Sequence, residues 1–200
     1  HMGNQASSTT SSTLYDESTE HFVRRGNYYR HKNEDCAVGE LPEGHKKVAL
    51  AAGCFWGTEK SFWRMPGVYA TAVGYIGGDD TIKPTYRMVC SGKTGHAEAT
   101  LVIYDPSIVS LVDLLYLFFS CHDPTQGNRQ GNDKGTQYRS GIYIYDKKDA
   151  NVCQAALRSM DQVLTADGYA PITTEIQMKR LFWYAEPYHQ CYLAKPGNRQ

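Results

Sequence analysis

The stretch "KVALAAGCFWGTEKSFW", residues 47–63, decides how this chain folds. Its continuous apolar run predicts a buried strand over residues 47–52. A helical pattern follows over residues 56–65 and is stopped by Pro66 and Gly67. Gly53 and Cys54 lie between the two, so we expect Cys54 at the N-terminus of the helix.

Two interpretations of Cys54 follow from this position. Unpaired N–H groups and the helix dipole favour an anion there, which would make the thiol a thiolate. Burial would instead raise its pKa, and a lone cysteine is often a small buried apolar residue. Gly53 and Gly57 enclose Cys-Phe-Trp and indicate a backbone that another group approaches closely. Phe55 and Trp56 fit a binding site or the core equally well.

Outward from this stretch, apolar periodicity predicts a two-layer α+β sandwich, a mixed sheet with helices packed on it. Ser110 and Asp113 form a capping-box pattern in front of an apolar helix. The other expected strands cover residues 69–78, 97–105, 140–146 and 172–186, and the other expected helices cover residues 151–165 and 188–195.

Composition places the chain among single-domain globular proteins. The 200 residues, 41% of them hydrophobic, suffice for one core. Residues 1–45 lack an apolar period and predict a flexible arm, with a short helix over 15–25 and an "HM" start typical of a tag remnant. Residues 46–200 are the expected globular domain. Lys+Arg and Asp+Glu both number 21, which gives no electrostatic case for nucleic acid or an anionic membrane. The apolar run at 108–119 is too short to cross a bilayer.

The cysteine pattern predicts reduced thiols in the cytoplasm, although a targeting segment could have been removed. No C-x-x-C pair occurs, and the clusters around His96 and His122 lack metal-ligand spacing, so we expect neither a metal nor a cofactor. The six cysteines stand singly: Cys36, Cys54, Cys90, Cys121, Cys153 and Cys191.

Three polar residues outside the opening stretch are candidates for chemistry. Glu98 begins an apolar strand, where partial burial would raise its pKa and make it a proton donor at neutral pH; the alternative is a surface glutamate. Asp133 and Tyr138 lie in a long polar loop at 122–140, a length typical of functional loops. They are a recognition pair or, alternatively, turn and strand-edge residues.

Other function classes stay open on the residues alone. A papain-like hydrolase needs a cysteine near a tryptophan together with a distant histidine and asparagine. Cys54 with Trp56 and the downstream His189 match the first two of these features. A noncatalytic module that binds peptides through aromatic side chains needs no reactive cysteine at all. A phosphatase-like loop is disfavoured, because bulky residues follow Cys54 instead of a glycine-rich loop with arginine.

Five segments together resemble the peptide methionine-S-sulfoxide reductase A family: "GCFWG" at 53–57, "TYRMVCSGKTGHAEA" at 85–99, "HDPTQGNRQGNDKGTQYRS" at 122–140, "ITTEI" at 172–176 and "AEPYHQCYL" at 185–193. The resemblance implies a ferredoxin-like core with long loops around the active site. It also implies reduction of methionine-S-sulfoxide, free or in oxidised proteins, and recycling by thioredoxin or a related dithiol.

The resemblance assigns the opening stretch to the reaction. Cys54 corresponds to the nucleophile that attacks the sulfoxide sulfur and is left as a sulfenic acid. Phe55 and Trp56 correspond to the aromatic pocket for the S-methyl group.

It also assigns the polar candidates. Glu98 corresponds to the acid that protonates the sulfoxide oxygen, and Tyr86 and Tyr138 correspond to phenol donors to the same oxygen. Asp133 corresponds to a residue that positions the substrate.

The sequence departs from the family where a second cysteine resolves the sulfenic acid. Many members carry a "GYxC" tail, whereas this sequence reads "HQCYLAKPGNRQ". Cys191 is therefore the expected resolving residue and Cys90 the second candidate, and an external thiol is the alternative to both. Cys121 and Cys153 are expected in the core.

Overall fold

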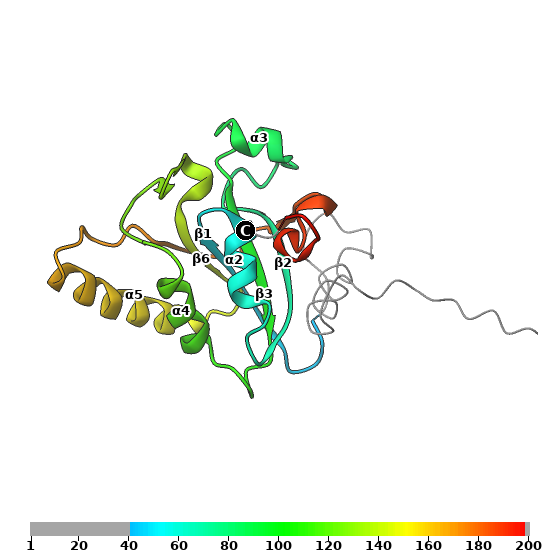
Figure 1. Cartoon of the computed structure of the whole chain (residues 1–200). Helices are drawn as coiled ribbons and strands as arrows, with labels where there is room; N and C mark the ends of the chain where they lie inside the picture. Colours follow the sequence, from blue (N-terminus) through cyan, green and yellow to red (C-terminus); the bar gives the residue numbers. More distant parts are fainter. Residues whose placement is uncertain (1–40, 199–200) are drawn as a thin grey trace, which may run out of the picture.

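The structure, a computed structural model, describes residues 41–198. A six-stranded sheet runs in the order β7-β6-β1-β3-β2-β8 (Figure 1). The predicted arm, apart from residues 41–45, lies outside the described residues, as does its expected helix at 15–25. The strands of the sheet are β1 (Lys46–Ala52), β2 (Val68–Ile76), β3 (Ala97–Tyr104), β6 (Ser140–Ile144), β7 (Glu175–Met178) and β8 (Trp183–Tyr184).

The four central strands confirm the ferredoxin-like core. Strands β6, β1, β3 and β2 are neighbours in that order, and each neighbouring pair is antiparallel. Helix α2 (Phe55–Phe62) connects β1 to β2, and helix α4 (Leu111–Ser120) lies between β3 and β6. The sheet is mixed because β7 pairs in parallel with β6. The predicted α+β class is therefore confirmed.

The helices bury the apolar core against the sheet. Val48 and Leu50 of β1 belong to the same cluster as apolar residues of α2, α4 and α5 (Asp149–Ala166). Their neighbours Ala49 and Ala51 point to the other face, where Phe182 packs on small side chains. This alternation is the period of a strand with both faces buried.

Several local predictions are confirmed at the level of hydrogen bonds. Asp113 N–H donates to Ser110 Oγ at 3.1 Å and Ser110 N–H donates to Asp113 Oδ2 at 3.0 Å, so the capping box starts α4 as expected. Strand β1 and helix α2 also occur where predicted, although α2 ends at Phe62 rather than at residue 65.

Two predictions in the C-terminal quarter are wrong. The single strand expected over 172–186 is two strands at opposite edges of the sheet, because the chain turns at Lys179, whose φ is 57°. The single helix expected over 188–195 is two short 3-10 helices, η2 (Pro187–His189) and η3 (Tyr192–Ala194). Cys191 separates them, because its left-handed φ of 47° cannot continue a helix.

Three short elements were not predicted, and all of them surround the N-terminus of α2. They are α3 (Tyr86–Cys90), the hairpin of β4 (Arg129–Gln130) and β5 (Asp133–Lys134), and the 3-10 helix η1 (Thr136–Tyr138). Each is too short to produce a sequence period.

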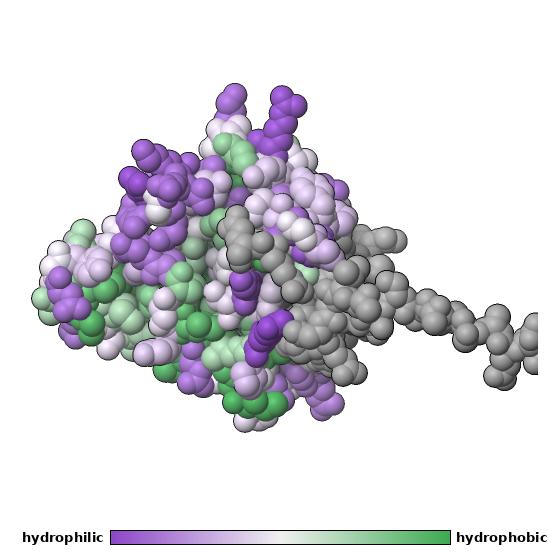
Figure 2. Space-filling view, in the orientation of Figure 1, coloured by the Kyte–Doolittle hydropathy of each residue, from purple (hydrophilic) through white to green (hydrophobic). Residues whose placement is uncertain are grey.

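The surface differs between the two ends of the molecule. Hydrophilic side chains gather over α3 and the loop that carries β4 and β5, whereas hydrophobic ones are more frequent over α4 and α5 (Figure 2). Among residues 41–198, no helix has the length and apolar character needed to cross a membrane. The same residues contain no group of three or more metal-ligating side chains that could hold a metal ion.

Candidate active site

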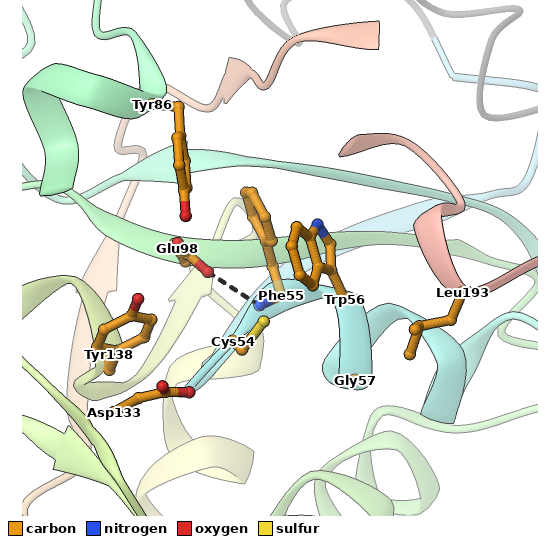
Figure 3. A pocket seen from close by; sticks show the side chains of 9 residues that line it. All are labelled: Cys54, Phe55, Trp56, Gly57, Tyr86, Glu98, Asp133, Tyr138 and Leu193. Atoms are coloured by element: carbon orange, nitrogen blue, oxygen red, sulfur yellow. Dashed lines mark hydrogen bonds between the residues drawn. The ribbon is translucent and has the colours of Figure 1, made fainter. Parts of the chain in front are cut away.

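A cavity of about 420 Å³ lies at the N-terminal end of α2 (Figure 3). It brings together seven of the eight residues proposed from the sequence. Cys191 is the exception, and Gly57 and Leu193 are additions. The lining residues are Cys54, Phe55, Trp56, Gly57, Tyr86, Glu98, Asp133, Tyr138 and Leu193.

Cys54 is the N-cap residue of α2, as predicted from the strand-to-helix junction. Of the two interpretations of Cys54, the structure favours the thiol whose pKa is raised by burial over the thiolate. Burial raises the pKa of the Cys54 thiol to about 11, and the negative charge of Glu98 raises it further. The N–H groups of Trp56 and Gly57 act in the opposite direction but do not offset the loss of solvation. With this pKa, Cys54 is a half-buried thiol that keeps its proton at neutral pH.

Glu98 lies on β3 beneath the first turn of α2. Its Oε2 accepts a hydrogen bond from Phe55 N–H at 3.0 Å, and the residue is only 2% exposed. Burial raises the pKa of Glu98 to about 7, although the bond from Phe55 lowers it. Glu98 is therefore not a surface glutamate. It is a buried carboxyl that can hold a proton at neutral pH beside the Cys54 thiol.

Two phenols complete the polar side of the cavity. Tyr86 comes from α3 with its hydroxyl pointing toward Glu98, and Tyr138 faces the cavity from the loop side (Figure 3). Burial raises the pKa of both hydroxyls, that of Tyr138 to about 12 and that of Tyr86 to a still higher value. Both hydroxyls therefore stay protonated at neutral pH and can donate hydrogen bonds to an oxygen bound between them.

Phe55 and Trp56 form the aromatic wall, but they are held differently. Phe55 is buried and packs on Tyr75, with ring centroids 5.8 Å apart. Trp56 stacks on Tyr192 with ring centroids 3.8 Å apart and planes 9° apart, and its Nε1–H donates to His189 Nδ1 at 3.0 Å. Residues 187–194, the C-terminal segment that carries η2 and η3, therefore fix the orientation of Trp56.

His189 does not form the cysteine–histidine pair of a papain-like site. Its Nδ1 accepts a hydrogen bond from Trp56 Nε1–H, and its ring packs on Tyr86 with centroids 4.6 Å apart. Burial lowers the pKa of His189, so the imidazole is neutral. His189 thus supports the aromatic wall instead of activating Cys54.

The loop that carries Asp133 packs directly on the Cys54 junction. A Cβ atom at Gly53, whose φ is 90°, would lie 2.8 Å from the side chain of Gln130. Gln130 accepts a bond from Asp123 N–H at 3.0 Å and donates to Asp123 O at 2.8 Å. Gly53 is therefore required both by its backbone angle and by the close approach of the loop.

The other cysteines occupy different environments. Cys191 is 1% exposed, packs with Trp63 and Ala194, and is not among the residues that line the cavity. Cys90 is exposed one helical turn after Tyr86 on α3. Cys153 lies in the core as predicted. The prediction for Cys121 is wrong, because it is the exposed C-cap residue of α4.

The sequence analysis missed residues that do not themselves line the cavity but hold its lining in place. Glu59, Gln190 and Tyr192 belong to this group. Gln190 is buried and bonds to both the N–H and the C=O of Val73, at 2.8 and 2.9 Å. For Glu59 a signal existed: it shares a helical face with Phe55 and Phe62, and a charged residue on an apolar face requires a partner.

Known proteins share this chain's sequence and fold. A family model described as "Peptide methionine sulfoxide reductase" matches residues 46–200. A peptide methionine sulfoxide reductase MsrA of Azorhizobium caulinodans is 54% identical over 168 residues, which cover 84% of this chain and 77% of the relative.

Two solved structures extend the comparison. Methionine sulfoxide reductase A of Corynebacterium diphtheriae superposes with a TM-score of 0.73 at 42% identity, covering 80% of each chain. Mxr1 of Saccharomyces cerevisiae in complex with Trx2 superposes with a TM-score of 0.51 at 26% identity, covering 78% of this chain and 89% of that one. The extent of these matches, from β1 to the C-terminal segment, shows that the chain belongs to the peptide methionine sulfoxide reductase family.

Proposed function

We propose that this protein reduces methionine-S-sulfoxide to methionine with Cys54 as nucleophile, and that residues 46–200 are its catalytic domain. One observation carries the proposal. A single cavity is lined on one side by a thiol, a carboxyl of raised pKa and two phenols, and on the other by the aromatic wall of Phe55 and Trp56. A sulfoxide presents the three matching features: an electrophilic sulfur, a basic oxygen and a methyl group.

The first step transfers the sulfoxide oxygen to Cys54. Sγ of Cys54 forms a bond to the sulfoxide sulfur while Glu98 supplies a proton to the oxygen, with Tyr86 and Tyr138 as hydrogen-bond donors to it. The S–H bond of Cys54 breaks in the same step, and the Glu98 carboxylate takes the thiol proton in place of the one it gave. The oxygen then passes to Sγ, so that methionine leaves and Cys54 is a sulfenic acid. The sulfoxide is reduced by two electrons and the thiol is oxidised by two electrons. Asp133 lies at the cavity rim, where we assign it to positioning the substrate.

Stereochemistry tests this site directly. The methyl group against Phe55 and Trp56 and the oxygen toward Glu98 fix two of the substituents on the sulfur, so only one epimer should be consumed. The family to which the chain belongs makes the S epimer the expected one. Chiral chromatography of a mixture of both epimers of free methionine sulfoxide measures the remaining fractions. Equal loss of both epimers would contradict the proposed pocket.

Recycling requires a second thiol and an external dithiol. A thiol attacks the Cys54 sulfenic acid, a disulfide forms and water leaves; exchange with a dithiol then restores Cys54. The structurally similar Mxr1 is known in complex with Trx2. We therefore assign reduction of this enzyme to a thioredoxin or a related dithiol, and we keep Cys191 as the resolving residue to be tested.

The resolving role of Cys191 predicts a specific disulfide. Substrate without reductant should give a Cys54–Cys191 bond in peptide mapping. Cys191→Ser should lose thioredoxin-dependent turnover and keep a full first turnover. The Cα atoms must come within about 7 Å for this bond. Because Cys191 is buried outside the cavity lining, the C-terminal segment has to move after the first step.

Cys90→Ser is the matched comparison, since Cys90 is exposed at the other side of the cavity on α3. If Cys191→Ser cycles normally and Cys90→Ser does not, the resolving role belongs to Cys90. If both variants cycle normally, an external thiol resolves Cys54.

A further inference from the structure

Glu59 is a buried carboxylate that the proposed reaction does not use. It lies on the sheet-facing side of α2 and is 0% exposed. Within residues 41–198, no lysine or arginine forms an ion pair with it. Burial raises the pKa of Glu59 to about 7, and hydrogen bonds to the carboxylate lower it. Burial of a carboxyl costs folding free energy unless hydrogen bonds or an opposite charge compensate for the lost hydration.

The contacts of Glu59 connect α2 to two other elements. Thr71 of β2 donates its hydroxyl to Oε1 at 3.0 Å. The backbone N–H of Cys191 donates to Oε2 at 2.9 Å, and its Sγ lies 3.6 Å from Oε1. Cys191 has a left-handed φ of 47°, which is unfavourable for a residue with a Cβ atom. The bond to Glu59 thus holds the backbone at this strained residue.

The residues on both sides of Cys191 form the back of the aromatic wall. His189 accepts a hydrogen bond from Trp56 Nε1–H, and Tyr192 stacks on the ring of Trp56. Leu193 lines the cavity itself. A loss of the anchor at Cys191 would therefore displace three residues that define the position of Trp56 or the shape of the cavity.

We propose that Glu59 is a positioning residue. Its hydrogen bond from Cys191 N–H, which we call the latch, holds residues 189–193 against Trp56 and keeps Cys191 buried beside α2. The inference rests on the proposed function for its kinetic consequence, but the latch itself is a structural contact. While the latch is closed, Trp56 is ordered for substrate. Any reaction of Cys191 with the Cys54 sulfenic acid requires the latch to open.

The local chemistry of Cys191 agrees with a closed latch. Burial raises the pKa of the Cys191 thiol far above its usual range, and the neighbouring Glu59 raises it further. A thiol in this environment is a weak nucleophile, because the thiolate is the reactive form. Movement of Cys191 away from Glu59 and into solvent would remove both the burial and the neighbouring negative charge, and would therefore lower the pKa of its thiol.

Cys191 is a built-in reporter for this latch. Glu59→Met removes the acceptor at similar volume, whereas Glu59→Gln removes the charge but keeps an oxygen that can accept from Cys191 N–H. We expect alkylation of Cys191 by N-ethylmaleimide at pH 8, read peptide by peptide in a mass spectrometer, to be about ten-fold faster in Glu59→Met than in Glu59→Gln. Comparison of two uncharged variants cancels the effect of charge on the thiol pKa.

Cys153, buried between α5 and the sheet, is the internal control for global unfolding. Faster labelling of Cys191 with Cys153 still protected supports the latch. Equal labelling of Cys191 in the two variants overturns it. If Glu59→Met also exposes Cys153, Thr71→Val decides, since it removes only the bond that orients Oε1. In that variant, faster Cys191 labelling with Cys153 protected supports the latch and unchanged labelling overturns it.

Kinetics separate positioning from a loss of stability. In single-turnover reduction of methionine sulfoxide, Glu59→Met should raise the half-saturating substrate concentration by about ten-fold relative to Glu59→Gln and change the limiting rate by less than about three-fold. An unchanged half-saturating concentration would overturn the link to Trp56. The labelling result does not depend on activity, so failure of the latch and failure of the proposed reaction are distinguishable.

Discussion

Cys54→Ser should abolish reduction of methionine sulfoxide, with a loss of at least about 10³-fold in the single-turnover rate. A hydroxyl is a far weaker nucleophile at neutral pH, and it cannot accept the sulfoxide oxygen in the way that a thiol does when it becomes a sulfenic acid. The fold should persist, because Cys54 is the N-cap residue of α2 and serine is a favourable N-cap. Methionine release, measured by chromatography, and thermal unfolding followed by circular dichroism give the two readouts.

Cys121→Ser is the matched control for this variant, since Cys121 is an exposed cap residue at the other end of a different helix. It should keep the wild-type rate. Activity of Cys54→Ser close to that of Cys121→Ser would show that Cys54 is not the nucleophile.

Glu98→Gln should slow the first turnover by roughly 10²-fold, the usual contribution of general acid catalysis. The amide keeps an oxygen that can accept from Phe55 N–H, so the first turn of α2 stays capped. What the variant loses is the proton. Rapid-quench measurement of methionine formation isolates this step from recycling, and an unchanged rate would exclude Glu98 as the acid.

The pH dependence of the same step gives an independent test of Glu98. Its pKa is raised to about 7, so the carboxyl is protonated below that pH and loses the proton above it. The first-turnover rate of the wild type should therefore fall as the pH rises through about 7. The rate of an exposed thiol acting alone would instead increase with pH, because the thiolate is the reactive form. Glu98→Gln should lack this fall. A rate that rises steadily from pH 6 to 9 in the wild type would contradict the assignment.

Local sequence signals predicted the parts of the fold that depend on local interactions. The capping box at Ser110 and the apolar run before Gly53 both produced the expected elements. The stretch 172–186 failed because strand propensity does not say which edge of a sheet a segment joins. A left-handed turn at Lys179 separates β7 from β8, and tertiary pairing at the two edges of the sheet decides their places.

The site was predicted as a set of residues, and their roles in the reaction stay predictions. The resemblance identified the residues that now line one cavity, but the ionisation of Cys54 could not be predicted, since burial outweighs the helix N-terminus only once the surrounding atoms are placed. The support from Glu59 and His189 was missed for a related reason. These residues act through contacts with segments more than 100 positions away.

Trapping of the oxidised Cys54 tests the central claim most directly. The Cys90→Ser/Cys191→Ser double variant, which lacks both candidate resolving thiols, is incubated with the S epimer of methionine sulfoxide and dimedone in the absence of reductant. The proposed mechanism predicts one equivalent of methionine per enzyme and a dimedone adduct on Cys54, identified by peptide mass spectrometry. Methionine release without oxidation of Cys54, or an acyl adduct on Cys54 in place of the sulfenic acid, would contradict it.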